Sequence, residues 1–185
     1  MWNLPNLLTF LRILLIPLLV LVYYLPIEGR YLLAAAIFAL AAVTDWFDGY
    51  LARKLDQTTA FGAFLDPVAD KLIVAVALVI LVQSRPELLV VLPTMIIIGR
   101  EILISALREW MAEMGRRTSV AVSMLGKVKT TLQMIAIMLL LLADPSQGGL
   151  FNTLGILMLY AAAILTLWSM ILYLSAAWPR LTGKE

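Results

Sequence analysis

The chain has 185 residues, of which 63% are hydrophobic and only 14% are charged. A soluble domain averages about 45–50% apolar and about 25% charged residues, so this composition predicts a membrane protein with one domain, residues 1–185. The absence of cysteine excludes disulfides and thiolate chemistry, and the net charge of +2 is too small to suggest nucleic-acid binding. Because histidine is also absent, acid–base chemistry falls to Asp, Glu, Lys or Tyr, and a metal would be bound by oxygen.

Six segments are long and apolar enough to cross a bilayer as helices, since one crossing takes roughly 20 such residues. The expected fold class is therefore all-α, a polytopic membrane protein with six transmembrane helices, although one or two segments are also compatible with interfacial helices. The first segment has no small-residue cleavage site, so no cleavable signal peptide is expected. The segments are Leu7–Tyr24, Tyr31–Tyr50, Pro67–Gln83, Leu88–Met111, Leu125–Leu142 and Phe151–Ala176.

The distribution of basic residues predicts the orientation. Six crossings place both termini on one side of the membrane, and 12 of the 14 Lys and Arg residues fall on that side, because only Arg30 and Arg85 fall on the other. Loops rich in Lys and Arg stay in the cytoplasm. We therefore expect both termini, and the aspartates described next, to face the cytoplasm.

Four aspartates lie where the second segment ends and the third begins. Asp45 and Asp48 are three residues apart, and Asp66 and Asp70 are four apart, so each pair shares a helix face. A connection of about fifteen residues would let the two faces meet. Each aspartate inside a membrane costs about 2.5–3.5 kcal/mol, which makes four accidental ones improbable. The cluster therefore indicates a function.

Two divalent cations would neutralise these four carboxylates. With oxygen donors only, the site favours Mg²⁺, with Mn²⁺ as an alternative, and two such ions suit phosphoryl transfer. Gly49 and Ala52 would let a nucleotide or phosphate approach the backbone, and Arg53 can pair with a phosphate. Gly62 lies in the connection before the second pair. Isolated acidic residues would instead be compatible with proton or cation transport.

The complete pattern D-x2-D-G-x2-A-R-x8-G-x3-D-x3-D resembles the signature of the CDP-alcohol phosphotransferases. This resemblance implies a six-helix membrane enzyme, a homodimer, that transfers a phosphatidyl group from CDP-diacylglycerol to an alcohol and releases CMP. By position, it makes Asp45, Asp48, Asp66 and Asp70 metal ligands and makes Asp70 the general base. It implies a CDP site that contains Asp48, Gly49, Ala52, Arg53 and Gly62.

Basic residues at the cytoplasmic ends of the fourth and fifth segments indicate an acceptor that carries a phosphate. The candidates for binding it are Arg100, Arg108, Lys127 and Lys129, although the two lysines would also suit contacts with lipid headgroups. The stretches REILISALREWMAE and GKVKTTLQM resemble bacterial family members whose acceptor is sn-glycerol 3-phosphate and whose product is phosphatidylglycerophosphate. That resemblance implies a location in the bacterial cytoplasmic membrane.

Alternatives remain at this point. Within the family, the acceptor could be inositol phosphate, serine or phosphatidylglycerol, and outside it the four carboxylates would suit a small cation transporter. A purely structural bundle gives no reason for clustered charges. A polar face of Asn6, Thr9 and Arg12 in the first segment could lie against the nucleotide or against the lipid interface.

Overall fold

The computed structural model describes residues 4–55, 60–113 and 124–181. Within these ranges all regular structure is helical, which confirms the all-α prediction. The six helices match the six predicted segments in number and order. They are α1 (Leu4–Tyr24), α2 (Arg30–Leu55), α3 (Ala60–Ser84), α4 (Leu88–Glu113), α5 (Met124–Leu142) and α6 (Leu150–Leu181).

The largest difference from the predicted boundaries is at the start of α3. We expected this helix to begin at Pro67, because proline is favoured in the first helical turn. The helix instead begins at Ala60 and continues through Pro67. The prediction of a connection of about fifteen residues is therefore wrong, since only residues 56–59 separate α2 from α3. Gly62 lies inside α3 rather than in a connection, and all four aspartates are carried by helices.

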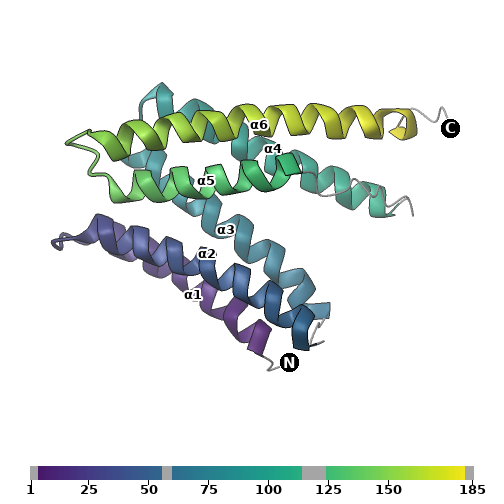
Figure 1. Ribbon diagram of the computed structural model, residues 1–185, viewed down its shortest axis with the longest axis horizontal. Helices are drawn as coiled ribbons and strands as arrows, with labels where there is room; N and C mark the ends of the chain where they lie inside the picture. Colours follow the sequence, from purple (N-terminus) through teal and green to yellow (C-terminus); the bar gives the residue numbers. More distant parts are fainter. Residues whose placement is uncertain (1–3, 56–59, 114–123, 182–185) are drawn as a thin grey trace.

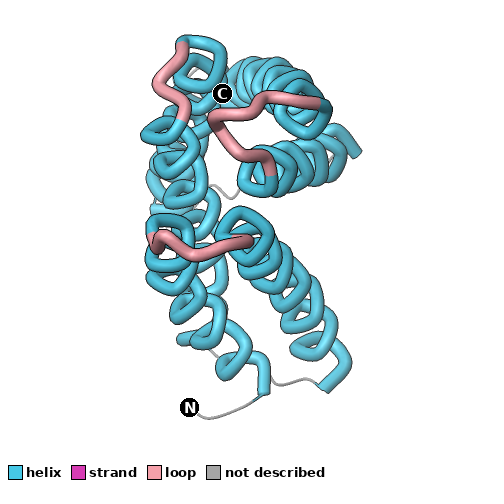
Figure 2. The backbone as a smooth tube through the Cα atoms, turned by 90° about the vertical axis from the view of Figure 1, so that its left-hand side faces the viewer, coloured by secondary structure: helices cyan, strands magenta, loops and turns pink. Residues whose placement is uncertain are grey.

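The helices form two groups that α3 joins. Helix α1 packs against α2 and α3, while α6 packs against α4 and α5, and α5 also contacts α2 and α3 (Figure 1). The view along the bundle separates the α1–α2 pair from the group that contains α5 and α6 (Figure 2). The α1–α2 and α5–α6 turns lie at one end of the molecule, and both termini point toward the other end (Figure 1).

One apolar core connects all six helices. Its buried side chains include Leu19, Phe38, Leu78, Leu140 and Leu159, each at most 1% exposed. Helices α5 and α6 approach each other closely at Gly155, where a Cβ atom would lie only 2.7 Å from Leu140 Cγ. Apolar side chains also cover much of the outer surface, as expected of a protein surrounded by lipid.

Three helices have described stretches that are long and apolar enough to cross a membrane by length and composition. They are Asn6–Tyr24 in α1, Leu88–Glu113 in α4 and Leu150–Ser175 in α6. The prediction of six crossings therefore has direct support from these three helices, and the other three remain a prediction.

The end of the molecule that carries the α5–α6 turn is held by a buried arginine. Arg85 is 5% exposed and follows α3. Its guanidinium donates hydrogen bonds to the carbonyl oxygens of Leu140 (2.9 Å) and Ala143 (2.6 Å), and to Asn152 Oδ1 (3.0 Å) at the start of α6. A cation at the end of α5 satisfies carbonyl groups that have no partner within the helix and complements the helix dipole. Arg85 therefore ties α3, α5 and α6 together.

Candidate active site

The polar face of α1 lies directly against the aspartates of α2 and α3. Arg12 is completely buried, and its Nη1 atom donates a hydrogen bond to Asp70 Oδ1. The same nitrogen lies 3.2 Å from Asp45 Oδ1. One guanidinium thus joins the first aspartate of the first pair to the last aspartate of the second, across three helices.

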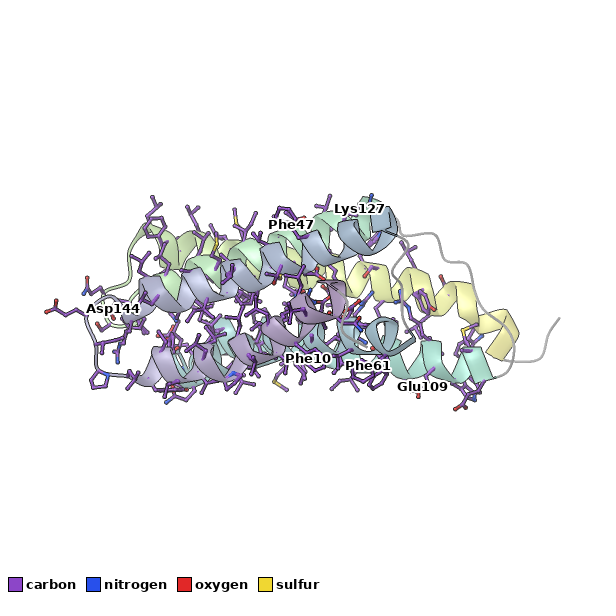
Figure 3. All side chains as sticks on the ribbon, turned by 90° about the horizontal axis from the view of Figure 1, so that it is seen from below. Phe10, Phe47, Phe61, Glu109, Lys127 and Asp144 are labelled. Atoms are coloured by element: carbon purple, nitrogen blue, oxygen red, sulfur yellow. The ribbon has the colours of Figure 1, made fainter. Side chains whose placement is uncertain are left out.

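Thr9 extends this arrangement by one helical turn. It is fully buried, and its hydroxyl donates a hydrogen bond to Asp66 Oδ1. Asn6, a further turn away, is 3% exposed. The structure therefore places this face inside the bundle and beside the carboxylates, which excludes the lipid-interface alternative. The aromatic rings of Phe10 and Phe61, 6.1 Å apart, pack α1 against α3 beside it (Figure 3).

Five further residues were predicted to bind the metal or the CDP, four on α2 and one on α3. The side chains of Asp48, Gly49, Ala52 and Arg53 lie outside the described residues, although their backbone belongs to α2. Gly62 is buried in α3, two turns before Asp70. Their assignments to the metal and the CDP therefore remain predictions.

A cavity of about 480 Å³ opens beside Asp70, between α3, α4 and α5. Among the described residues, its polar lining is two carboxylates, two lysines and three uncharged hydrogen-bonding groups, and the rest is apolar. Lys71 donates a hydrogen bond to Ser105 Oγ, which joins α3 to α4 across this space. The polar residues that line it are Asp70, Lys71, Glu101, Ser105, Lys129, Thr130 and Gln133.

The four basic residues predicted to bind a phosphate differ in position. Lys129 is 7% exposed and lines the cavity with Asp70. Arg100 and Arg108 are close enough to Lys129 to interact with it electrostatically. Arg100 forms an ion pair with Glu101, and the Arg108 guanidinium lies 5.5 Å from the centre of the Tyr173 ring on α6. Lys127 is exposed, at the edge of the molecule in Figure 3. It does not line the cavity.

The chemistry of the carboxylates fits a divalent cation. Asp45 and Asp70 both contact a single cationic nitrogen, so their oxygen atoms already converge on one positive charge. The donors are all oxygen, as Mg²⁺ prefers. Within the part of the chain that the structure describes, no three carboxylates are grouped closely enough to hold a metal. The side chain of Asp48, the fourth predicted ligand, lies outside the described residues, so its part in a metal site remains a prediction.

Sequence reasoning missed five of the polar residues that line the described part of the cavity: Lys71, Glu101, Ser105, Thr130 and Gln133. The spacing of these polar residues along their helices gave only a weak indication of a shared cavity. Lys71 follows the last aspartate directly, and Ser105 lies one helical turn after Glu101. On α5, Gln133 lies one turn after Lys129, so both share one face. Polar residues at such spacing within apolar helices would have predicted a polar cavity at this level of the bundle.

Comparison with known proteins identifies the group to which the chain is related. It is 56% identical over 180 residues to a CDP-diacylglycerol–glycerol-3-phosphate 3-phosphatidyltransferase of Pseudomonas fluorescens, which covers 97% of this chain and 92% of that protein. It is also 56% identical over 176 residues to the protein of that name from Escherichia coli strain K12, covering 95% of each chain. The family model for CDP-alcohol phosphatidyltransferases matches residues 2–168. The chain belongs to the CDP-alcohol phosphatidyltransferase family.

Proposed function

We propose that this protein transfers the phosphatidyl group of CDP-diacylglycerol to sn-glycerol 3-phosphate, giving phosphatidylglycerophosphate and CMP. The observation that carries the proposal is the 56% identity, over nearly the full length of both chains, to relatives named for this activity. The site supports it independently, because aspartates that suit metal and phosphate chemistry adjoin a cavity lined by a buried lysine. A phosphorylated acceptor suits that charge.

We infer that the metal of this site is Mg²⁺, two ions in number, with Mn²⁺ as the alternative. Asp45, Asp48, Asp66 and Asp70 would hold the ions, which when bound would neutralise the pyrophosphate and stabilise charge on the attacking and leaving oxygens. Arg12 adds a positive charge within the same cluster. Gly49, Ala52, Arg53 and Gly62 are the proposed residues of the CDP site.

The base of the reaction is proposed to be Asp70, because among the aspartates whose side chains the structure describes it lines the cavity, and Asp45 and Asp66 do not. Asp70 would take the proton of the 1-hydroxyl group of the acceptor. That oxygen would attack the phosphorus that bears the diacylglycerol, and the bond from this phosphorus to CMP would break. Lys129 is the first candidate to bind the acceptor phosphate. The positive charges of Arg100, Arg108 and Lys127 lie farther out and would attract the anion electrostatically.

The proposed topology has six transmembrane helices in one domain, residues 1–185. Both termini and the aspartates would face the cytoplasm of a bacterial cell. The single core shared by all six helices supports one domain, and the termini pointing toward one end support an even number of crossings (Figure 1). A homodimer is implied by the family resemblance, and cross-linking in membranes would test it.

The decisive experiment is an acceptor screen with the purified protein and CDP-diacylglycerol. Radiolabelled glycerol 3-phosphate, inositol phosphate, serine and phosphatidylglycerol are supplied separately with Mg²⁺. A new radiolabelled lipid, resolved from the supplied acceptor by thin-layer chromatography, is expected only with glycerol 3-phosphate, and transfer to another acceptor instead would refute the assignment. In Asp70→Asn, turnover should be lost while the melting temperature stays close to that of the wild type. A variant with normal turnover would disprove the role of Asp70 as base.

A further inference from the structure

The cavity beside Asp70 contains a second carboxylate for which the reaction described above has no use. Glu101 of α4 lines the same space as Asp70, Lys71 and Lys129. An acceptor phosphate would be repelled by this carboxylate and would be drawn to the lysines instead. A hydroxyl group, by contrast, donates well to a carboxylate. Glu101 therefore suits a part of the acceptor that carries a proton to donate.

One oxygen of the Glu101 carboxylate is paired with its neighbour Arg100. Arg100 Nη1 lies 3.1 Å from Glu101 Oε2, and Arg100 Nη2 is 3.4 Å from Ser169 Oγ on α6. Among the described residues, no group donates a hydrogen bond to the second oxygen, Oε1. The carboxylate is 39% exposed and faces a cavity, so one oxygen is anchored and the other is accessible to a ligand.

The neighbouring hydroxyl groups offer weaker alternatives as acceptors. Ser105 donates to the carbonyl oxygen of Glu101 at 2.7 Å and already accepts a hydrogen bond from Lys71. Thr130 donates to the carbonyl oxygen of Gly126 at 3.0 Å. A charge-assisted bond to a carboxylate is roughly twice as strong as one between neutral groups. Of the described residues that line the cavity, Glu101 is therefore the strongest hydrogen-bond acceptor apart from Asp70.

We propose that Glu101 is a specificity-determining residue that binds the free 2-hydroxyl group of the acceptor, and that Arg100 positions it. This inference rests on the proposed function. Glycerol 3-phosphate has two hydroxyl groups, of which one attacks and the other stays in the product. With the attacking hydroxyl at Asp70 and the phosphate at Lys129, the middle hydroxyl needs an acceptor, because a buried polar group without a partner is costly.

The test compares two acceptors that differ by one group. 3-Hydroxypropyl phosphate keeps the primary hydroxyl and the phosphate of glycerol 3-phosphate but lacks the 2-hydroxyl. The wild type should prefer glycerol 3-phosphate by about 10- to 100-fold in kcat/KM, the range for one hydrogen bond to a charged group. In Glu101→Ala this preference should fall close to one, because only glycerol 3-phosphate loses a contact. In Glu101→Gln it should fall less, since the amide oxygen still accepts.

Two further variants separate specificity from general damage. Lys129→Ala should weaken both acceptors equally and leave their ratio unchanged, because both carry the phosphate. Glu109→Ala removes an exposed acid from the same helix, outside the cavity, and should leave the rates and the ratio at wild-type values (Figure 3). Arg100→Lys should lower the ratio only in part, because an ammonium keeps the charge but not the planar fork.

The outcomes are distinct. Equal loss with both acceptors in Glu101→Ala, or a wild-type protein that does not distinguish them, would overturn the role of Glu101 while glycerol 3-phosphate remained the acceptor. If the wild type transferred the phosphatidyl group to neither acceptor, the proposed function itself would fail. If Glu101→Ala did not fold, the ratio measured in Glu101→Gln would decide, and a ratio equal to that of the wild type would overturn the inference.

Discussion

Removing the charge of Arg12 should destabilise the bundle at the aspartate cluster. Arg12 is fully buried, whereas the Asp45 and Asp70 side chains are 47% and 42% exposed. A hydrogen bond to a charged group contributes about 1.5–3 kcal/mol, so the hydrogen bond to Asp70 and the ion pair to Asp45, taken at the same value, contribute at most about 3–6 kcal/mol. Because water can solvate the half-exposed carboxylates once they lose the arginine, we reduce this by about half, to about 1.5–3 kcal/mol.

The assay is thermal unfolding in detergent, with a chelator and again with saturating Mg²⁺. For a chain of this length, about 1.5–3 kcal/mol corresponds to a fall in melting temperature of about 3–12 °C. Arg12→Met is the variant of choice, since it keeps most of the packing volume and removes the charge. Arg12→Lys keeps the charge and should lose less.

Magnesium should reduce the difference between Arg12→Met and the wild type, because the added cations compensate the same carboxylates. Two results would refute this reasoning. One is an Arg12→Met protein as stable as the wild type in the chelator, which would mean that the ion pairs contribute nothing. The other is equal losses in the Met and Lys variants, which would assign the effect to packing rather than to charge.

Three further predictions concern the acceptor site and the packing of α5. Lys129→Ala should raise the KM for glycerol 3-phosphate much more than that for CDP-diacylglycerol, and more than Lys127→Ala does; equal effects on both substrates would contradict its role. Gly155→Ala should lower stability by about 1–3 kcal/mol in a thermal melt, because its Cβ would overlap Leu140. Arg85→Ala should cost about 2–4 kcal/mol in the same assay, since buried carbonyl groups lose charged donors, and an unchanged melting temperature would disprove that role.

The sequence was sufficient to predict the number, type and order of the helices, because each is a long apolar run closed by turn-forming residues. It was not sufficient for the start of α3. Pro67 normally marks the first turn of a helix, but in this bundle the helix continues through it. Packing against neighbouring helices overrode the local preference. The same error made the aspartate connection too long and placed Gly62 outside the helix.

The candidate site, too, could be predicted from the sequence only in part. The aspartates could be singled out from the sequence, because the free-energy cost of a carboxylate in a membrane does not depend on which helix lies beside it. The choice of partner was not predictable, since it depends on how the helices are rotated against one another. Arg12 was therefore expected to lie against the nucleotide or the lipid interface, and the structure places it between Asp45 and Asp70.

Asp70 belongs to two environments at once, and this has a mechanistic consequence. It is paired with Arg12 on the side of α1, and it lines the cavity between α3, α4 and α5 on the other. A base that lay only in the carboxylate cluster could not reach the hydroxyl group of an acceptor in the cavity. A base that lay only in the cavity would be far from the proposed metal site, where the pyrophosphate of the CDP-lipid would bind. Helix α3 joins the two groups of helices, so in the proposed mechanism it would bring the two substrates to one carboxylate. Displacement of α3 should therefore impair the transfer more than the binding of either substrate alone.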